Sequence, residues 1–301
     1  MAFVTEDNIT DLAVKRWATA YSPRTAELMS VLVRHIHDYA REVGLTTEEW
    51  MAAVDWLTEV GKISTDKRQE FILASDVFGL STLVVQMNNR LPAPATPATV
   101  LGPFYIDGSP PAPFGFDMSD GVEGTPLFIT GTVTDTAGTP IAGAILDVWQ
   151  ADATGTYEAQ YAELDEARLR AKYSTRCDGT YCVRTIAPLG YNIPMDGPVG
   201  RLIKATDISA YRPAHVHCLL EAPGYHRLIT HLFQYGTDYL DTDVVFGVQD
   251  ELVVGFVEHL AGTGPDGQQM DQPFLVARYD FVLQALDTDP CMAPRAPKNR
   301  S

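Results

Sequence analysis

The stretch RPAHVHCLLEAPGYHRLITHLF, residues 212–233, decides which fold its surroundings can adopt. Apolar and polar residues alternate in AHVHCLLEA and again in HRLITHLF, and Pro223-Gly224 lies between the two runs. Alternation with a period of two is typical of β-strands, and a Pro-Gly pair between two such runs is typical of a turn. The stretch therefore predicts a β-hairpin.

The first strand of this hairpin carries His215 and His217. Residues two apart on a strand point to the same face about 6.6 Å apart, so both imidazoles can converge on one metal ion. His35 and His37 have the same spacing in a helical pattern, where two steps rotate by about 200° and the rings diverge. Glu221 shares the face of the strand pair but lies too far along to join it. Two readings stay open here, namely ordinary sheet histidines or half of a metal site completed from elsewhere.

Two further pairs of short strands are expected upstream of the hairpin. FITGTVTD and AGAILDVWQ flank a turn at residues 136–140, and AKYSTR and YCVRTI flank a turn at residues 177–180. Short alternating segments separated by turns favour a β-sandwich. We expect this β-sandwich domain to span residues 127–289 and the tail, residues 290–301, to be disordered.

Residues 1–91 have a helical periodicity instead. Ser22, followed by a proline, begins one predicted helix, and Thr46 forms a capping box with Glu49 before a second. Thr65 begins a third predicted helix that carries apolar residues at helical spacing.

Residues 92–126 are rich in proline and connect the two regions. A helix does not survive this density of proline, so the segment is expected to be an extended linker that contributes to a pocket. The expected fold class is α+β, mainly β, with a β-sandwich core and an all-helical N-terminal region.

The composition argues against several classes of partner. The chain has 39 acidic and 22 basic residues, which gives a formal net charge of −17. This surplus of negative charge argues against binding to nucleic acid and against electrostatic attachment to a membrane. It also gives an anionic or phenolic ligand no help from the overall field, so any attraction must be local.

The ends and the cysteines are consistent with a cytoplasmic protein. The first 20 residues show no signal-peptide pattern, and no segment approaches about 18 uncharged apolar residues. Cys177, Cys182, Cys218 and Cys291 are too sparse for a disulfide framework and are expected to be reduced, although Cys177 and Cys182 could face each other across a turn.

Three short motifs follow one another along the chain, namely Gly155-Thr-Tyr157, Pro188-Leu-Gly-Tyr191 and Arg212-Pro-Ala-His-Val-His217. Together they resemble the intradiol ring-cleavage dioxygenases. The motif LGPFY (101–105) is similar to the pocket loop of that family, and ILDVW (145–149) is similar to its strand before the first tyrosine. The resemblance runs from the N-terminal helices to about residue 284.

The resemblance implies a non-haem Fe(III) ion, one per subunit, held by two tyrosinates and two histidines. Carried over by position, these ligands are Tyr157, Tyr191, His215 and His217, with Tyr157 and His217 axial. Fe(III) is a hard ion that prefers anionic oxygen ligands, and a highly charged ion can displace the proton of a phenol whose ordinary pKa is about 10.

The resemblance also implies catalytic roles for three residues. Tyr191 is expected to leave the metal and accept a proton from the diol, and Arg212 is expected to stabilise negative charge on the ring. His231 stands where many catechol-cleaving relatives have glutamine, and we expect it to orient Arg212 or a ligand by a hydrogen bond rather than to bind the metal.

The implied substrates are a small aromatic diol or triol and O2. The corresponding pocket consists of Leu73, Asp76, Val100, Leu101, Gly102, Pro103, Phe104, Ile193, Pro194, Arg212 and Val245. Asp76 is the acidic exception in a mostly apolar wall, and its carboxylate can accept a hydrogen bond from a third ring hydroxyl. We therefore expect hydroxyquinol (benzene-1,2,4-triol), cleaved to 3-hydroxy-cis,cis-muconate or maleylacetate, with catechol or chlorocatechol as the alternative.

Family members pair through their N-terminal helices around a lipid. The resemblance therefore implies a homodimer through residues 1–91, with a possible phospholipid at its interface. The alternative is that the apolar residues Leu28, Val31, Leu32 and Ile36 only face the β-sandwich of their own chain. Two other classes of function compete with the dioxygenase. One is a metal-free β-sandwich binding module, in which Tyr157 and Tyr191 match by chance. The other is a zinc hydrolase that uses the same histidines, for which we find neither a carboxylate ligand nor a general base.

Overall fold

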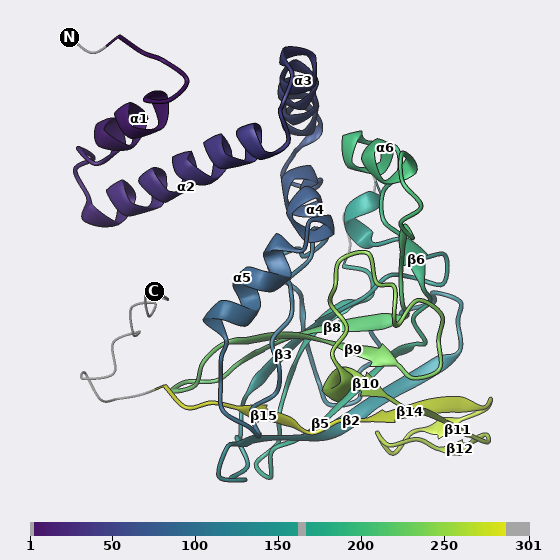
Figure 1. Ribbon diagram of the computed structural model, residues 1–301. Helices are drawn as coiled ribbons and strands as arrows, with labels where there is room; N and C mark the ends of the chain where they lie inside the picture. The colour runs from purple at the N-terminus through teal and green to yellow at the C-terminus, as the bar shows by residue number, and fades with distance from the viewer. Residues whose placement is uncertain (1–2, 162–166, 287–301) are drawn as a thin grey trace. The chain divides into compact units, whose positions relative to one another are not determined.

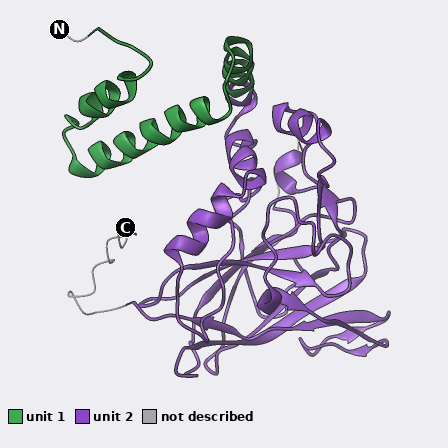
Figure 2. Cartoon of the chain, viewed as in Figure 1, with its two compact units in different colours: residues 1–59 green, residues 60–301 purple. Residues whose placement is uncertain are grey.

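A computed structural model describes residues 3–161 and 167–286 of the chain (Figure 1). The described chain divides into two compact units, residues 1–59 and residues 60–301 (Figure 2). The tail predicted to be disordered, residues 290–301, lies outside the described residues, as does the end of the predicted domain at 287–289.

The first unit is helical and contains α1 (Ile9–Trp17), α2 (Pro23–Glu42) and most of α3 (Thr47–Ile63). The predicted start of α2 is confirmed, because the Ser22 hydroxyl accepts a hydrogen bond from the Thr25 amide. The predicted capping box of α3 is also confirmed, since Thr46 and Glu49 each accept a hydrogen bond from the amide of the other. The sequence did not predict α1.

The second unit begins with two short helices, α4 (Glu70–Val77) and α5 (Leu80–Asn88). The sequence predicted one helix from Thr65, and this was wrong at both ends of α4. Residues 65–68 form a turn in which the Thr65 hydroxyl accepts from the Arg68 amide, and Gly79, at φ 69°, separates α4 from α5. Among the described residues no single helix is long and apolar enough to cross a membrane; α4 and α5 reach that length and composition only as a pair bent by 80°.

Two sheets form the body of the second unit. The six-stranded sheet has the order β1-β4-β3-β8-β9-β10, with bounds Pro111–Ala112, Arg170–Ser174, Ile145–Trp149, His215–Glu221, Leu228–Gln234 and Val253–Val254. The other sheet has the order β11-β14-β2-β15, with bounds Phe256–His259, Phe274–Arg278, Pro126–Asp135 and Phe281–Leu283, and β5 (Thr180–Ile186) also pairs with β2. Smaller elements complete the unit: η1 (Glu158–Gln160), β6 (Tyr191–Asn192), α6 (Pro198–Lys204), β7 (Tyr211–Arg212), η2 (Asp250–Leu252), β12 (Gly262–Thr263) and β13 (Gln269–Met270).

The main core lies between the two sheets, so the predicted β-sandwich is confirmed. Leu127 and Ile129 of β2 and Val183 of β5 belong to the same buried cluster as Leu146 of β3 and Val216 of β8. Each sheet therefore buries one face against the other, as the alternation of apolar residues requires.

Only one of the three predicted strand pairs is a hairpin. Strands β8 and β9 pair directly, whereas β2 and β3, and likewise β4 and β5, lie in different sheets. Both outcomes produce the same alternating pattern, because a turn that crosses between the sheets of a sandwich also separates two half-buried strands.

The proline-rich segment, residues 92–126, runs along both sheets. The Thr99 amide donates to the carbonyl of Ile229 in β9, and the Met118 amide donates to the carbonyl of Arg184 in β5. The segment thereby carries residues 100–104 to the end of β8 at which the histidines lie.

Candidate metal centre

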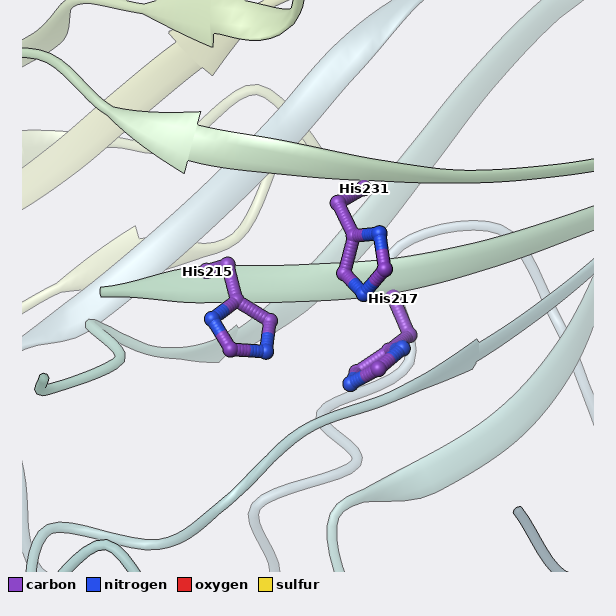
Figure 3. A group of neighbouring side chains, drawn as sticks. All are labelled: His215, His217 and His231. Atoms are coloured by element: carbon purple, nitrogen blue, oxygen red, sulfur yellow. The ribbon is translucent and has the colours of Figure 1, made fainter. Parts of the chain in front are cut away.

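Three buried histidines meet on one face of β8 and β9 (Figure 3). His215 and His217 share a face of β8, and the register of the hairpin places His231 of β9 directly opposite His217. One ring nitrogen of each of the three lies within 4.8 Å of the others. The meeting follows from the strand alternation and the hairpin register alone.

Two tyrosines complete the cluster. The phenol oxygen Oη of Tyr157 lies 3.2 Å from Nε2 of His215 and 3.0 Å from Nε2 of His217. Oη of Tyr191 lies 3.2 Å from Oη of Tyr157. The structure thus brings the four sequence-predicted ligands together, and the side chain of each is almost fully buried.

Tyr157 stands at the end of a tight loop. Oδ1 of Asp152 accepts hydrogen bonds from the amides of Thr154 (2.8 Å) and Thr156 (3.1 Å), and the Tyr157 amide donates to Oε1 of Gln160 at 2.8 Å. Gly155 adopts φ 79°, and a Cβ atom there would lie 2.5 Å from Cβ of Tyr191. Glycine therefore lets the two tyrosine-bearing segments approach each other.

Tyr191 is paired with Arg212 across the two-stranded ladder of β6 and β7. The Arg212 guanidinium donates to both carboxylate oxygens of Asp243, at 3.0 and 3.2 Å, and its Nη1 lies 3.1 Å from Nε2 of His215. Asp243 also accepts from the Gly247 amide at 2.9 Å. This buried, bidentate ion pair fixes the guanidinium beside the cluster.

Burial keeps the cluster uncharged in the absence of a cation. It raises the pKa of Tyr157 well above the ordinary value, and it also raises the pKa of Tyr191, although Arg212 acts in the opposite direction. Burial and the nearby Arg212 lower the pKa of His215 to about 3. Burial and His215 lower the pKa of His217 well below its ordinary value.

The donor set fits a hard cation. Nδ1 of His215 donates to the carbonyl of Pro213 at 2.7 Å, which leaves Nε2 as the lone-pair nitrogen that faces Tyr157. Neutral imidazoles with lone pairs directed inward, together with two phenol oxygens, are the donors that a trivalent ion needs. Nδ1 of His217 and Nε2 of His231 have no hydrogen-bond partner among the described residues.

The contacts of His231 bear on one of the two roles expected for it, the orientation of Arg212, and leave the orientation of a ligand as a prediction. Its Nδ1 is hydrogen-bonded to the Thr99 hydroxyl and not to Arg212, whose guanidinium is held by Asp243. The ring centroid of His231 lies 4.2 Å from that of His217, because the two residues are opposite each other in the ladder. His231 therefore presents Nε2 toward the cluster instead of orienting the arginine.

Several of the predicted pocket residues line two cavities. Asp76, Val100, Leu101 and Gly102 line a cavity of about 380 Å³ beside α5, and Phe104 and Pro194 line a second of about 410 Å³. Leu73, Ile193, Arg212 and Val245 line neither cavity but are buried, and Pro103 is half-buried. A Cβ atom at Gly102 would lie 3.2 Å from Cε1 of His217, so the backbone at residue 102 lies directly against this histidine.

Three residues that hold the site have no role in the sequence-based prediction. These are Asp243, which pairs with Arg212; Thr99, which bonds to His231; and Trp149, whose ring stacks on His217 with centroids 4.7 Å apart. An acid before the apolar run VVFG is a weak signal for a buried partner. Only the register of β3 with β8, which places Trp149 opposite His217, shows the stacking.

Two family models match the chain, "Dioxygenase" over residues 100–285 and "Catechol dioxygenase N terminus" over residues 22–96. A 6-chlorohydroxyquinol 1,2-dioxygenase from Cupriavidus pinatubonensis is 46% identical over 92% of this chain and 97% of its own. An intradiol ring-cleavage dioxygenase from Aspergillus niger is 40% identical over 94% of this chain and 86% of its own. The solved structure of a hydroxyquinol 1,2-dioxygenase from Pseudomonas putida DLL-E4 superposes with a TM-score of 0.86 at 41% identity, covering 93% of this chain and 99% of that one.

Proposed function

The chain belongs to the intradiol ring-cleavage dioxygenase family, and from this premise we propose that its substrate is hydroxyquinol. The enzyme inserts both atoms of O2 into a 1,2-dihydroxybenzene and cleaves the ring between the two hydroxylated carbons, which gives a muconate-type dicarboxylate. With hydroxyquinol the product is 3-hydroxy-cis,cis-muconate or its tautomer maleylacetate. Catechol or a chlorocatechol is the second candidate.

One observation carries the choice of hydroxyquinol. Asp76 on α4 is 1% exposed and lines an otherwise mostly apolar cavity, and its Oδ1 has no hydrogen-bond partner among the described residues. Burial raises the pKa of Asp76 to about 6, so the carboxylate is still mostly ionised at neutral pH. A buried carboxylate oxygen without a donor favours a ligand that supplies one, and the third hydroxyl of hydroxyquinol is such a donor.

The metal of this iron-dependent family is proposed to be Fe(III), one ion per chain, bound by Tyr157, Tyr191, His215 and His217. The convergence of two phenol oxygens and two inward-facing Nε2 atoms supports this set. When bound, ferric iron supplies the positive charge that ionises the phenols and withdraws electron density from a chelated diol. His231 remains outside the set, with Nε2 free to bond to a ligand or to the diol.

The side chains around the metal have separable tasks. Oη of Tyr191 would be the base that accepts a proton from the diol. Arg212 stabilises negative charge that develops on the ring, and burial, which opposes its charge, is overcome by Asp243, so that the pKa of Arg212 is raised. Val100, Leu101 and Phe104 are apolar side chains that exclude water from the ring.

The quaternary structure proposed for the enzyme is a homodimer through the N-terminal helices, with a phospholipid at the interface. Leu28, Val31, Leu32 and Ile36 of α2 are all exposed and share one stripe of the helix, which a second copy or an acyl chain would cover. Light scattering of the purified protein, with mass spectrometry of extracted lipids, tests both parts. A monomer that yields no lipid would reject them.

A single purification tests the proposed function. The protein should contain about one iron per chain and absorb visible light, because tyrosinate bound to Fe(III) is coloured. Oxygen uptake should give a larger kcat/KM for hydroxyquinol than for catechol. A preference for catechol would favour the second candidate, and a colourless protein that binds zinc would reject the ferric centre.

A further inference from the structure

His231 is the third histidine of the buried cluster, and its two ring nitrogens have different surroundings. Nδ1 is hydrogen-bonded to the hydroxyl of Thr99, and Nε2 faces the cluster without a hydrogen-bond partner among the described residues (Figure 3). His231 is completely buried and Thr99 is 4% exposed, so this hydrogen bond is shielded from solvent. A neutral imidazole carries one proton, and the partner at Nδ1 decides which nitrogen holds it.

The hydroxyl of Thr99 differs in kind from the group that bonds to Nδ1 of His215. That group is the carbonyl of Pro213, which can only accept, so Nδ1 of His215 carries the proton and its Nε2 keeps a lone pair. A hydroxyl can also donate. Among the described residues, Nδ1 of His231 is the one acceptor within reach of the Thr99 hydroxyl. When this hydroxyl donates, Nδ1 of His231 is the acceptor and Nε2 carries the proton.

The opposite tautomer of His231 leaves more polar groups unpaired. With the proton on Nδ1, the ring donates to Thr99, the hydroxyl hydrogen has no acceptor among the described residues, and the Nε2 lone pair is unpaired as well. With the proton on Nε2, only this one N–H is unpaired. Buried polar groups without partners destabilise a fold, so the contacts favour the tautomer of His231 that has its proton on Nε2.

Both partners of this hydrogen bond are held in place by the backbone. The Thr99 amide donates to the carbonyl of Ile229 at 2.8 Å, and the carbonyl of Ala98 accepts from Nε2 of Gln249 at 3.0 Å. His231 is itself fixed by the ladder of β8 and β9. The hydroxyl is therefore presented to Nδ1 by a segment anchored on the same strand that carries the imidazole.

We propose that Thr99 is a positioning residue that holds His231 with its proton on Nε2. In this form Nε2 has no lone pair for a metal ion and is instead a hydrogen-bond donor that faces the cluster. Thr99 thereby separates His231 from His215 and His217, although the three histidines offer nitrogens within 4.8 Å of one another. The ionised oxygens of phenols or of a diol around a cation are acceptors that suit such a donor, and this last step rests on the proposed function.

Nuclear magnetic resonance of the full chain tests the tautomer, with isotope-labelled histidine and with Ga(III), a trivalent ion without unpaired electrons, in place of iron. Long-range proton–nitrogen correlations distinguish a protonated Nε2 from a protonated Nδ1, and His231→Gln identifies the signals of this histidine. The wild type and Thr99→Ser should have the proton on Nε2. Thr99→Val, which replaces the hydroxyl by a methyl group, should populate the form with the proton on Nδ1. A wild type with the proton on Nδ1, or a Thr99→Val variant with an unchanged tautomer, would overturn the proposal.

Turnover by the iron-loaded enzyme gives a second readout. Thr99→Val should retain the iron and lower kcat/KM for hydroxyquinol by about 10- to 100-fold, the range for removing the hydrogen-bond partner of a residue at a metal site. Thr99→Ser, which keeps the hydroxyl, should stay close to the wild type. A loss of the same size in Thr99→Ser would mean that packing and not the hydroxyl matters, and would reject the proposal.

Thr230→Val is the matched control. It also removes a buried threonine hydroxyl, which donates to the carbonyl of Pro97 in the same segment, but residue 230 points to the opposite face of β9 from His231. This variant should keep the tautomer and the turnover of the wild type, and the same change as in Thr99→Val would reject the proposal. A wild type that lacks iron or does not turn over hydroxyquinol rejects the proposed function instead, because the tautomer is measured without substrate.

Discussion

The metal centre and the Asp76 cavity both bury polar groups beside residues 100–104, but they do so in opposite ways. At the metal centre every donor is neutral without a cation, since burial raises the phenol pKa values and lowers those of the imidazoles. In the cavity a carboxylate stays mostly ionised, with one oxygen lacking a partner. The first arrangement is complementary to a cation and the second to a hydrogen-bond donor on a ligand.

The two regions also differ in the elements that carry them. Four of the metal-centre side chains are fixed by strand register, because His215, His217 and His231 share one ladder and Tyr191 pairs with Arg212 in another. Asp76 stands on α4, a short helix followed at once by the break at Gly79. We infer that the sheets hold the general chemistry of the family, while the helices adjust which ring is accepted.

Removing a metal-centre donor should have the largest effect on iron content and activity. A small effect would contradict the contrast drawn between the two regions. Tyr157→Phe and His217→Ala should each lose the iron and the visible colour, and activity should fall by at least about 10³-fold, because a metal ligand is gone and, at Tyr157, its negative charge with it. Metal analysis and absorption spectra measure this. Tyr181→Phe, a buried tyrosine whose hydroxyl bonds to the carbonyl of Tyr279, and His35→Ala should both keep the iron. Full iron in Tyr157→Phe would reject the ligand set.

The Arg212–Asp243 pair separates metal binding from charge stabilisation. Arg212→Ala should retain the iron and the colour while kcat falls by about 10²–10³, the scale for removing one preorganised charge. Asp243→Asn should act in the same direction, since it no longer holds the guanidinium. Arg184→Ala, which removes an arginine from β5 in the other sheet, is the control. An unaltered kcat in Arg212→Ala would place the guanidinium outside the reaction.

The sequence predicted the metal centre better than the helices that carry the Asp76 cavity. The His-x-His spacing on a strand predicts how the two rings lie, because strand alternation puts both of them on one face. The family motifs then named Tyr157 and Tyr191, although no periodicity in the sequence could bring residues so far apart together. The start of α4 was misplaced because Arg68, at the end of the turn at residues 65–68, is held by the distant Asp196 and by Glu70, two residues further along. The role of Asp243 was likewise invisible, since it depends on burial against Arg212.

Asp76 should determine the preference for hydroxyquinol over catechol. Asp76→Ala should lower kcat/KM for hydroxyquinol by about 10- to 150-fold, the range for losing a hydrogen bond to a charged group, while catechol turnover holds or improves. Val84→Ala, which removes an apolar side chain from the same cavity, should affect both diols alike. The measurement is kcat/KM for both diols in each variant. Equal losses of kcat/KM for the two substrates in Asp76→Ala would mean that the carboxylate does not accept a hydrogen bond from the third hydroxyl.

The same carboxylate should destabilise the free enzyme, and this is the smallest effect we expect. Its pKa is about 6 in the folded chain against 3.8 ordinarily, so ionisation is disfavoured by folding. The raised pKa means that the buried carboxylate lowers the free energy of unfolding only when it is ionised. This cost is absent at low pH, grows as the pH rises between the two pKa values, and is constant above about pH 7. Asp76→Asn removes it and should raise the free energy of unfolding at pH 7.5 by up to about 3 kcal/mol.

Urea denaturation of both proteins at pH 4.5, 6 and 7.5 measures that difference. The gain of Asp76→Asn over the wild type should be small at the lowest pH and grow toward neutrality, because only the ionised carboxylate is unfavourable where it is buried. Asp178→Asn, at an exposed turn, should show no such growth. A gain that is equal at all three pH values would mean that the amide stabilises by packing. In that case the buried charge, which our substrate argument requires, would be absent from the free enzyme.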